Sequence, residues 1–161
     1  MGGATLHRTY TWRVLDIMKL DWAPLSCLRP IGHPSDQELA ESLQTITGML
    51  EHDRRLQRKS VMIVDMRKAG PLSAPQRRTS SEWMKKNLEL YKQCVLGGAF
   101  VIDSPIIRGV LTALLWVAPL DMPYEVVATL DDAVRWAISR FDAERVPVPE
   151  RLRVELGRVF T

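Results

Sequence analysis

Four basic side chains surround a predicted helix start, and they are the residues of this sequence best suited to binding chemistry. Arg67 and Lys68 follow a buried strand pattern, and Arg77 and Arg78 stand near the start of the helix expected next. Ligands of α/β proteins tend to bind at the carboxyl ends of the strands, where these side chains should cluster. The N–H groups of a helix start add positive potential. We therefore predict that the four residues recognise an acidic partner protein or an anionic ligand.

The charge of the chain is unevenly distributed around this group. Residues 54–92 hold eleven basic and three acidic side chains, a net charge of +8, whereas the rest of the 161-residue chain carries −5. The alternative interpretation is that Arg77 and Arg78 form exposed ion pairs with acidic residues such as Glu82 or Asp103. The basic residues fall at both ends of a predicted strand and lack interleaved aromatic residues, so we do not expect nucleic-acid binding.

A serine lies between the two pairs of basic residues. Ser73 begins the pattern Ser-Ala-Pro-Gln, which has the layout of a capping box, with Pro75 tolerated in the first helical turn. A phosphate on Ser73 would sit on helix N–H groups near Arg77 and Arg78, so phosphorylation is physically tolerable. Ser is also a preferred N-cap residue, so we expect Ser73 to be a cap and keep a phosphorylation site as the alternative.

No combination of residues indicates catalysis, a bound metal or a cofactor. Nucleophile-elbow, phosphate-loop and dinucleotide-binding motifs are missing from the sequence. Cys27 and Cys94 are far apart without a CxxC motif, and the three histidines lack metal-ligand spacing. Asp131 and Asp132 follow Thr129, and we expect them to cap a helix rather than act as paired carboxylates. We therefore predict a protein that is not an enzyme and that uses no metal or cofactor.

One aromatic side chain is predicted to lie at the surface. Trp83 and Trp136 fall on apolar faces of predicted helices, so we expect both in the core. Trp116 ends a predicted helix and is close in sequence to Pro119 and Met122. We predict that Trp116 and Met122 form a hydrophobic contact with a partner protein.

The length and composition indicate one globular domain. The chain is 46% hydrophobic and 25% charged, which is average for a globular protein and excludes disordered, collagen-like and disulfide-stabilised classes. The N-terminal residues lack the pattern of a secretory signal. The longest uncharged apolar stretch, residues 109–120, is shorter than the roughly 20 residues of a membrane span. We expect a cytoplasmic protein that does not span a membrane.

Hydrophobic periodicity predicts strands alternating with helices. Strand patterns cover residues 10–20, 25–31, 60–66, 95–102 and 124–128, and helix patterns follow caps at Ser35, Ser73, Ser104 and Thr129. The short connection between the first two strands predicts an antiparallel hairpin, whereas helical connections predict parallel pairing elsewhere. Gly97 and Gly98 mark a close approach of a helix or a ligand to the sheet. The third helix is expected to bury Ile107, Val110, Leu111, Leu114 and Leu115.

The order of these elements predicts an α/β fold in a single domain over residues 1–142. We expect a mixed β-sheet of about five strands with four main helices. Residues 143–161 form a C-terminal extension that starts extended at its prolines and is amphipathic through Leu152, Leu156 and Val159. We interpret this extension as a short amphipathic helix.

Residues 60–136 resemble the STAS-like superfamily, which groups anti-sigma factor antagonists with SEC14-like lipid-binding domains. The similarity rests on VMIVDMRKAG, a buried strand ending in Asp65, on the helix start SPIIRGVL, and on VVATLDDAVRWA, a closing strand and helix. It covers about half of the chain, and the first 35 residues match only in topology. The resemblance implies a STAS-like α/β fold and a non-enzymatic module.

The chain departs from the anti-sigma factor antagonists at their phosphorylation site. Those proteins carry an Asp-Ser pair at the start of the helix after this strand, but here Leu72 precedes Ser73. The chain does contain the pair Asp103-Ser104, but that pair follows the next strand. The phosphorylation switch of the antagonists is therefore not carried over by the motif itself.

Two functions remain open. The first is a regulatory or scaffold module that binds another protein, as the antagonist branch implies, either a different chain or a copy of itself. The second is a small-ligand or lipid-binding protein, as the SEC14-like branch implies. The second function needs an apolar cavity, and we expect 161 residues with many core side chains to leave little room for one. We therefore favour protein–protein interaction.

Overall fold

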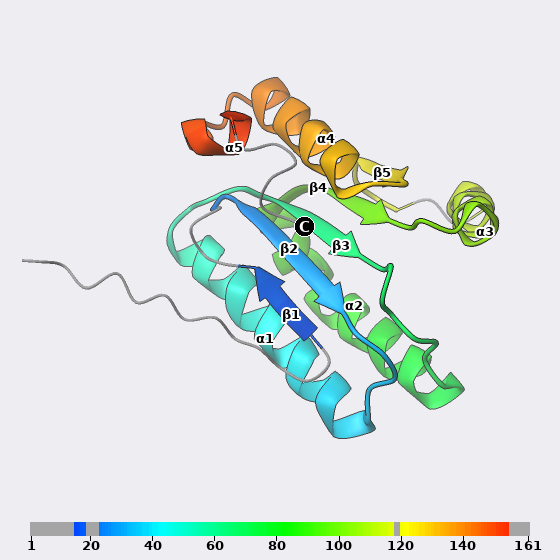
Figure 1. The fold of residues 1–161 in the computed structure, drawn as a ribbon. Coiled ribbons are helices and arrows are strands. Elements are labelled where there is room, and N and C mark those ends of the chain that lie inside the picture. The colour runs from blue at the N-terminus through cyan, green and yellow to red at the C-terminus, as the bar shows by residue number, and fades with distance from the viewer. Residues whose placement is uncertain (1–14, 19–22, 118–119, 155–161) are drawn as a thin grey trace, which may run out of the picture.

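A computed structural model of the chain describes residues 15–18, 23–117 and 120–154 (Figure 1). The strands are β1 (Leu15–Met18), β2 (Leu25–Pro30), β3 (Ser60–Asp65), β4 (Val95–Val101) and β5 (Tyr124–Val127). The helices are α1 (Asp36–Arg55), α2 (Ala74–Cys94), α3 (Pro105–Val117), α4 (Leu130–Ala143) and α5 (Glu150–Val154). The strand predicted over residues 10–20 appears as β1, and the rest of that range lies outside the described residues.

The strands lie side by side in the order β1-β2-β3-β4-β5. Four of them, β2 to β5, pair in parallel, and the short β1 pairs antiparallel with β2 at the edge of the sheet. The α/β class and the antiparallel hairpin are therefore confirmed. Parallel strands that follow each other in the chain need crossover connections, and α1, α2 and α3 provide them.

Side-chain caps start the helices where the sequence predicts them. Ser35 and Ser73 each form a complete capping box, at the starts of α1 and α2. Thr129 Oγ1 accepts a hydrogen bond from the N–H of Asp132 at 3.2 Å at the start of α4. These caps satisfy N–H groups that have no partner within the helix, so the helices begin at these residues.

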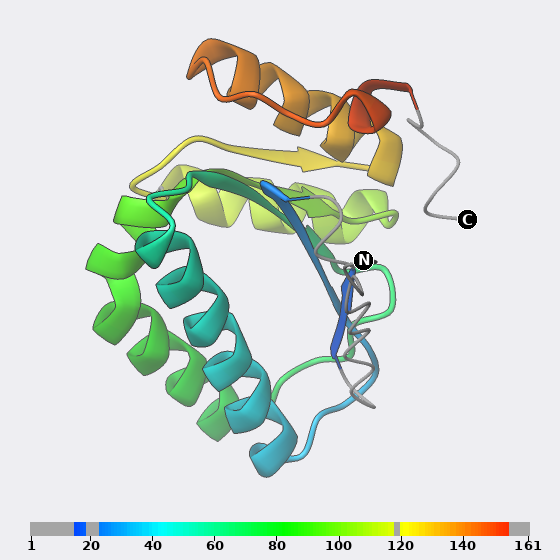
Figure 2. The ribbon, with the colours of Figure 1, turned by 90° about the vertical axis from the view of Figure 1, so that its left-hand side faces the viewer.

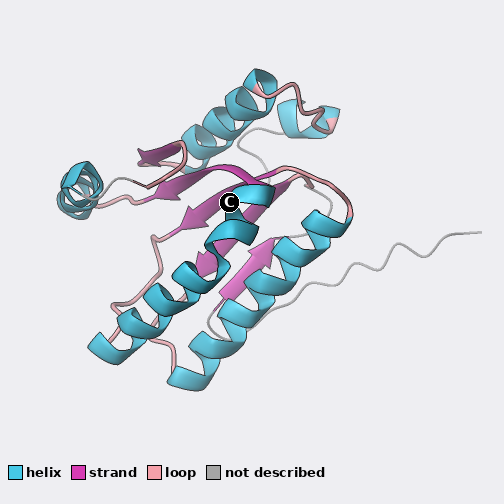
Figure 3. Ribbon diagram, turned by 180° about the vertical axis from the view of Figure 1, so that it is seen from behind, coloured by secondary structure: helices cyan, strands magenta, loops and turns pink. Residues whose placement is uncertain are grey.

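The helices form one layer on each face of the sheet. α1 and α2 lie side by side on one face, and α4 and α5 lie on the other (Figure 2 and Figure 3). Successive side chains of a strand point to opposite faces. Cys27 and Ile63 accordingly pack in the core under α4, whereas Leu28 and Met62 pack in the core under α1 and α2.

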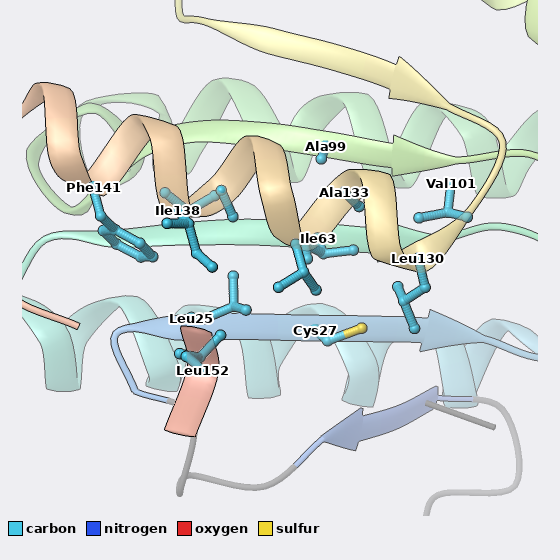
Figure 4. Packing of buried hydrophobic residues seen from close by; sticks show 13 residues of the cluster. Leu25, Cys27, Ile63, Ala99, Val101, Leu130, Ala133, Ile138, Phe141 and Leu152 are labelled. Atoms are coloured by element: carbon cyan, nitrogen blue, oxygen red, sulfur yellow. The ribbon is translucent and has the colours of Figure 1, made fainter. Parts of the chain in front are cut away.

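The core under α4 is densely packed. Ala99 of β4 and Ala133, Ala137 and Phe141 of α4 are fully buried there (Figure 4). A Cβ atom on Gly97 would lie 2.8 Å from the ring of Trp136, so only glycine fits beneath α4 at this point of the sheet. The prediction that these glycines mark a close approach of a helix or a ligand is confirmed for a helix at Gly97, whereas Gly98 lies against Met122.

The prediction that α3 buries its apolar side chains is wrong for Ile107. This side chain is 59% exposed, and Figure 1 shows α3 at one end of the sheet, apart from α1, α2 and α4. Leu111 is partly buried, and the side chains of Val110, Leu114 and Leu115 lie outside the described part of the chain. The apolar pattern of α3 identified a helix, but a sequence pattern does not show which surface, if any, covers it.

The segment after Asp142 packs onto the α4 face of the sheet. It includes the short helix α5, whose Leu152 is fully buried in the same core as Phe141, with Val146 and Val148 against it. Leu156 and Val159 lie outside the described residues. The described part of the predicted extension therefore shares the hydrophobic core of the domain.

Truncating Leu152 should destabilise the whole domain. Leu152→Ala removes a fully buried side chain, so we expect the free energy of unfolding to fall by about 2–5 kcal/mol in urea denaturation. The control Leu56→Ala changes a side chain that is 55% exposed, and we expect a change within about 0.5 kcal/mol. Equal, small effects of the two substitutions would contradict the placement of Leu152 in the core.

Candidate functional site

A cavity of about 300 Å³ lies between the sheet and the α1–α2 layer. Its walls come from the sheet, from α1 and from α2, and they are almost entirely apolar. They include Leu28, Met62, Val64 and Phe100 of the sheet, Leu39, Leu43 and Ile46 of α1, and Trp83, Met84 and Tyr91 of α2. The expectation that this chain leaves little room for an apolar cavity is therefore wrong.

Hydrogen bonds join α1 and α2 to each other above the cavity. Trp83 Nε1 donates to Thr47 Oγ1 at 2.9 Å, and Gln76 Nε2 donates to Asp36 Oδ1 at 2.9 Å. Gly98, which lines the cavity, presents no side chain to the helices. The periodicity of α1 predicts which side chains face the sheet, but not how far from it the helix pair stands.

Two loops meet beside the cavity at the carboxyl ends of β2 and β3. The N–H of Gly32 donates to Lys68 O at 2.8 Å, and the N–H of Gly70 donates to Gly32 O at 2.7 Å. A Cβ on Gly70 would lie 2.6 Å from Gly32 O, so this contact requires glycine. Both glycines line the cavity, and their hydrogen bonds fix the backbone there.

Of the described residues that line the cavity, three have polar side chains and none is charged. Ser42 Oγ donates to Glu38 O at 2.8 Å, and Trp83 is bonded to Thr47 as described. The hydroxyl of Tyr91 donates to the sulfur of Met62 at 3.5 Å. Burial raises the pKa of Tyr91 to about 12, so its hydroxyl is protonated at neutral pH.

Arg67 is exposed, and its guanidinium is paired with a buried carboxylate. Its Nε and Nη2 atoms donate to the two carboxylate oxygens of Asp65, each at 2.8 Å. Arg29 Nε donates to the same carboxylate at 3.1 Å. Asp65 is only 2% exposed, so a buried carboxylate joins the ends of β2 and β3 through Arg29.

The Asp65 carboxylate is held ionised by its partners. Burial alone raises the pKa of a carboxyl group, but here the hydrogen bonds from Arg67 and the charges of Arg67 and Arg29 outweigh burial. The pKa of Asp65 therefore falls below its ordinary value of 3.8.

The other predicted basic residues and Ser73 lie at the surface near the start of α2. Lys68, Arg77 and Arg78 are exposed, and Arg77 Nη1 donates to Leu72 O at 2.7 Å. Ser73 Oγ accepts from the N–H of Gln76 at 3.3 Å, as the cap interpretation expects. The Gln76 side chain also bonds Asp36 of α1, so a phosphate on Ser73 would disturb the junction of the two helices and add charge near that carboxylate.

The two residues predicted for a hydrophobic partner contact lie in different environments. Trp116 is 80% exposed on α3. Met122 is partly buried, lines the cavity and lies against Gly98, with its Cε atom 3.4 Å from where a Cβ would be. Met122 therefore belongs to the cavity.

Two further features, a metal-binding cluster and a membrane-spanning helix, are absent from the described part of the chain. Within it, no group of three or more His, Cys, Asp or Glu side chains is placed to hold a metal ion. Also within it, no helix is both long enough and apolar enough to cross a membrane.

Sequence reasoning missed the cavity residues but contained two signs of them. Gly98 has no side chain within a strand pattern, which indicates that a helix or a ligand comes close to the sheet. Tyr91 is an aromatic residue with a hydroxyl group in a predicted helix, and such a group needs a hydrogen-bond partner when it is buried. Neither sign gives a volume, because the distance between sheet and helices depends on contacts far apart in sequence.

Removing the Asp65 charge should change how stability depends on pH. Because the folded pKa lies below 3.8, Asp65 stabilises the fold above that pH, and the contribution is lost as pH falls through the folded pKa. Asp65→Asn should cost about 1.5–3 kcal/mol at pH 7, measured by urea unfolding. The gap from the wild type should narrow below pH 3.8.

The control for this prediction is Glu125→Gln, which neutralises an exposed carboxylate on β5. We expect it to change stability by less than about 0.5 kcal/mol at pH 7. A constant gap between wild type and Asp65→Asn from pH 7 to pH 2 would show that ionisation of Asp65 does not stabilise the fold.

Comparisons with known proteins identify the fold and nothing finer. No family model matches the chain, and no curated protein matches it. Among solved structures, it is similar to an uncharacterised protein of the DUF3478 family from Shewanella loihica PV-4, which has a SpoIIAA-like fold. The TM-score is 0.57 at 12% identity, over 85% of this chain and 99% of that one. The chain therefore has a SpoIIAA-like fold, which confirms the STAS-like resemblance at the level of fold.

Proposed function

We propose that this protein is a non-enzymatic binding module that holds an apolar molecule between its sheet and the α1–α2 layer. The observation that carries the proposal is the cavity of about 300 Å³ with apolar walls. Ligand pockets in proteins start at about this volume and are lined mainly by apolar and aromatic side chains. Water is a poor occupant of such a space, because each buried water molecule needs two to four polar partners.

The lining of the cavity supports binding rather than catalysis. Among the described lining residues, the one titratable side chain is that of Tyr91, whose pKa of about 12 is far from neutral pH. General acid–base catalysis works best with a group whose pKa lies near the working pH. The described lining also contains no Ser-His or Cys-His pair that would activate a nucleophile.

Filling the cavity should weaken the binding of an apolar molecule without unfolding the protein. Val64→Phe adds a ring from β3 into the existing space, so we expect little loss of stability. The probe is N-phenyl-1-naphthylamine, an uncharged dye that fluoresces in apolar sites. Its affinity should fall by about tenfold or more in fluorescence titrations.

The matched control is Leu88→Phe, which adds the same ring on α2 outside the cavity lining. It should bind the dye as the wild type does. Equal dye binding by Val64→Phe and Leu88→Phe would mean that the dye does not enter this cavity, and the proposal would fail.

A second candidate function is protein–protein recognition through the α3 surface, which consists of Ile106 and Trp116. Both side chains are 80% exposed, and their spacing of ten residues, about 2.8 turns, puts them on one side of the helix. Large exposed apolar side chains mark interaction sites. Helices that lie on membranes are rich in Lys and Arg, whereas α3 carries one charged residue, Arg108. These features favour a protein over a membrane as the partner of the α3 surface. We propose that α3 of a second copy of the chain packs against it.

The exposed basic residues near the start of α2 support the same class of function. Lys68, Arg77 and Arg78 are exposed and carry one sign of charge. Charge of one sign on a surface steers association with a partner of the opposite sign. An acidic protein is therefore the partner that we propose for this part of the surface.

Charges placed on the α3 surface should separate a dimer. We expect the wild type to sediment as a dimer, and Ile106→Asp with Trp116→Asp to sediment as a monomer, because a buried carboxylate without a partner is costly. The control Leu56→Asp changes another exposed apolar side chain and should leave the dimer intact. A wild type that sediments as a monomer at about 1 mM would remove the second copy as the occupant.

A further inference from the structure

The polar side chains of the cavity differ in how well their hydrogen-bonding groups are satisfied. Ser42 and Trp83 each donate to an oxygen at normal distance, 2.8 and 2.9 Å. Tyr91 donates only to the thioether sulfur of Met62, at 3.5 Å. A thioether is a weak acceptor, so Tyr91 holds the one donor of the lining side chains that an oxygen would satisfy better.

The hydroxyl of Tyr91 lies beside Met62 at the wall of the cavity. The side chain reaches from α2 to Met62 on β3, and both residues line the cavity. Tyr91 as a whole is only 8% exposed, so bulk water does not readily compete for its hydroxyl. A buried hydroxyl normally finds a good partner, and within this cavity the ligand is the one that remains.

The surroundings exclude a charged ligand group at this point. Among the described residues, no Lys, Arg or His lines the cavity, and Lys68, Arg77 and Arg78 are outside its lining. An ionised carboxylate buried without a cation costs far more free energy than a neutral carbonyl that accepts one hydrogen bond. The protonated Tyr91 offers one hydrogen bond and no positive charge.

We infer that the cavity takes an uncharged aliphatic molecule with one carbonyl oxygen, a ketone, aldehyde or ester, which accepts a hydrogen bond from Tyr91. This inference rests on the proposed function and names the chemical class of its ligand. The aliphatic part runs along α2 past Trp83, which is eight residues, or about 12 Å, from Tyr91. A cavity of about 300 Å³ holds about ten groups of the size of a water molecule. The length of about 12 Å and the volume of about 300 Å³ both fit an aliphatic chain of about ten carbons.

The test compares three molecules of equal chain length by their ability to displace N-phenyl-1-naphthylamine. They are undecane, 2-undecanone and undecanoate, at pH 7. We expect 2-undecanone to bind about 3- to 10-fold more tightly than undecane, which is the effect of one neutral hydrogen bond. Undecanoate should be the weakest of the three.

Two variants isolate the hydroxyl of Tyr91. Tyr91→Phe keeps the ring, so undecane should bind as in the wild type, but the preference for 2-undecanone should disappear. Met62→Leu removes the thioether at nearly constant volume and leaves the hydroxyl without its internal acceptor, so the preference should persist or increase. This variant tests the inference independently if Tyr91→Phe is unstable.

The outcomes separate this inference from the proposed function. Equal binding of undecane and 2-undecanone by the wild type, or a preference that survives in Tyr91→Phe, would overturn the role of Tyr91 while apolar binding stands. Tightest binding of undecanoate would overturn the neutral class of ligand. Failure of the dye and all three molecules to bind would overturn both proposals.

Discussion

α4 lies close to the sheet because small residues meet at the contact, and the rest of the structure depends on this close approach. Ala133 and Ala137 of α4 and Ala99 of β4 are fully buried, and Gly97 leaves room for the ring of Trp136. Burial of apolar surface at high packing density is the main source of stability in a domain. Because this face supplies a dense core, the opposite face can keep space between its helices and strands without loss of the fold.

The α1–α2 layer is built to tolerate that space. The two helices are joined by Trp83 to Thr47 and by Gln76 to Asp36, bonds that do not involve the sheet. Cys94, at the end of α2, also packs in the core under this layer and anchors it to the strands. The layer is thus joined near the starts of the two helices and along their contact, and the cavity lies between this layer and the sheet.

Local chemistry explains which features the sequence could predict. A cap such as Ser73 acts on residues three positions away, and the buried pattern of residues 60–66 lies within one strand, so both are visible in a short window. The cavity depends on pairs such as Trp83 and Thr47, 36 residues apart, which no local pattern contains. The prediction that Ile107 is buried is wrong for a related reason, because an apolar helix pattern does not show whether another element covers the helix.

The charge of residues 54–92 drew attention to the carboxyl edge of the sheet, but part of that charge stabilises the fold. Arg67 and Arg29 neutralise the buried Asp65, so their presence is explained by stability. The cavity has no such explanation, because unfilled apolar volume costs free energy and a larger side chain at a position such as Gly98 or Val64 would reduce it. This cavity lowers stability and is lined almost wholly by apolar groups, so we propose that it is kept for a ligand, beside the partner proposed for the charged edge.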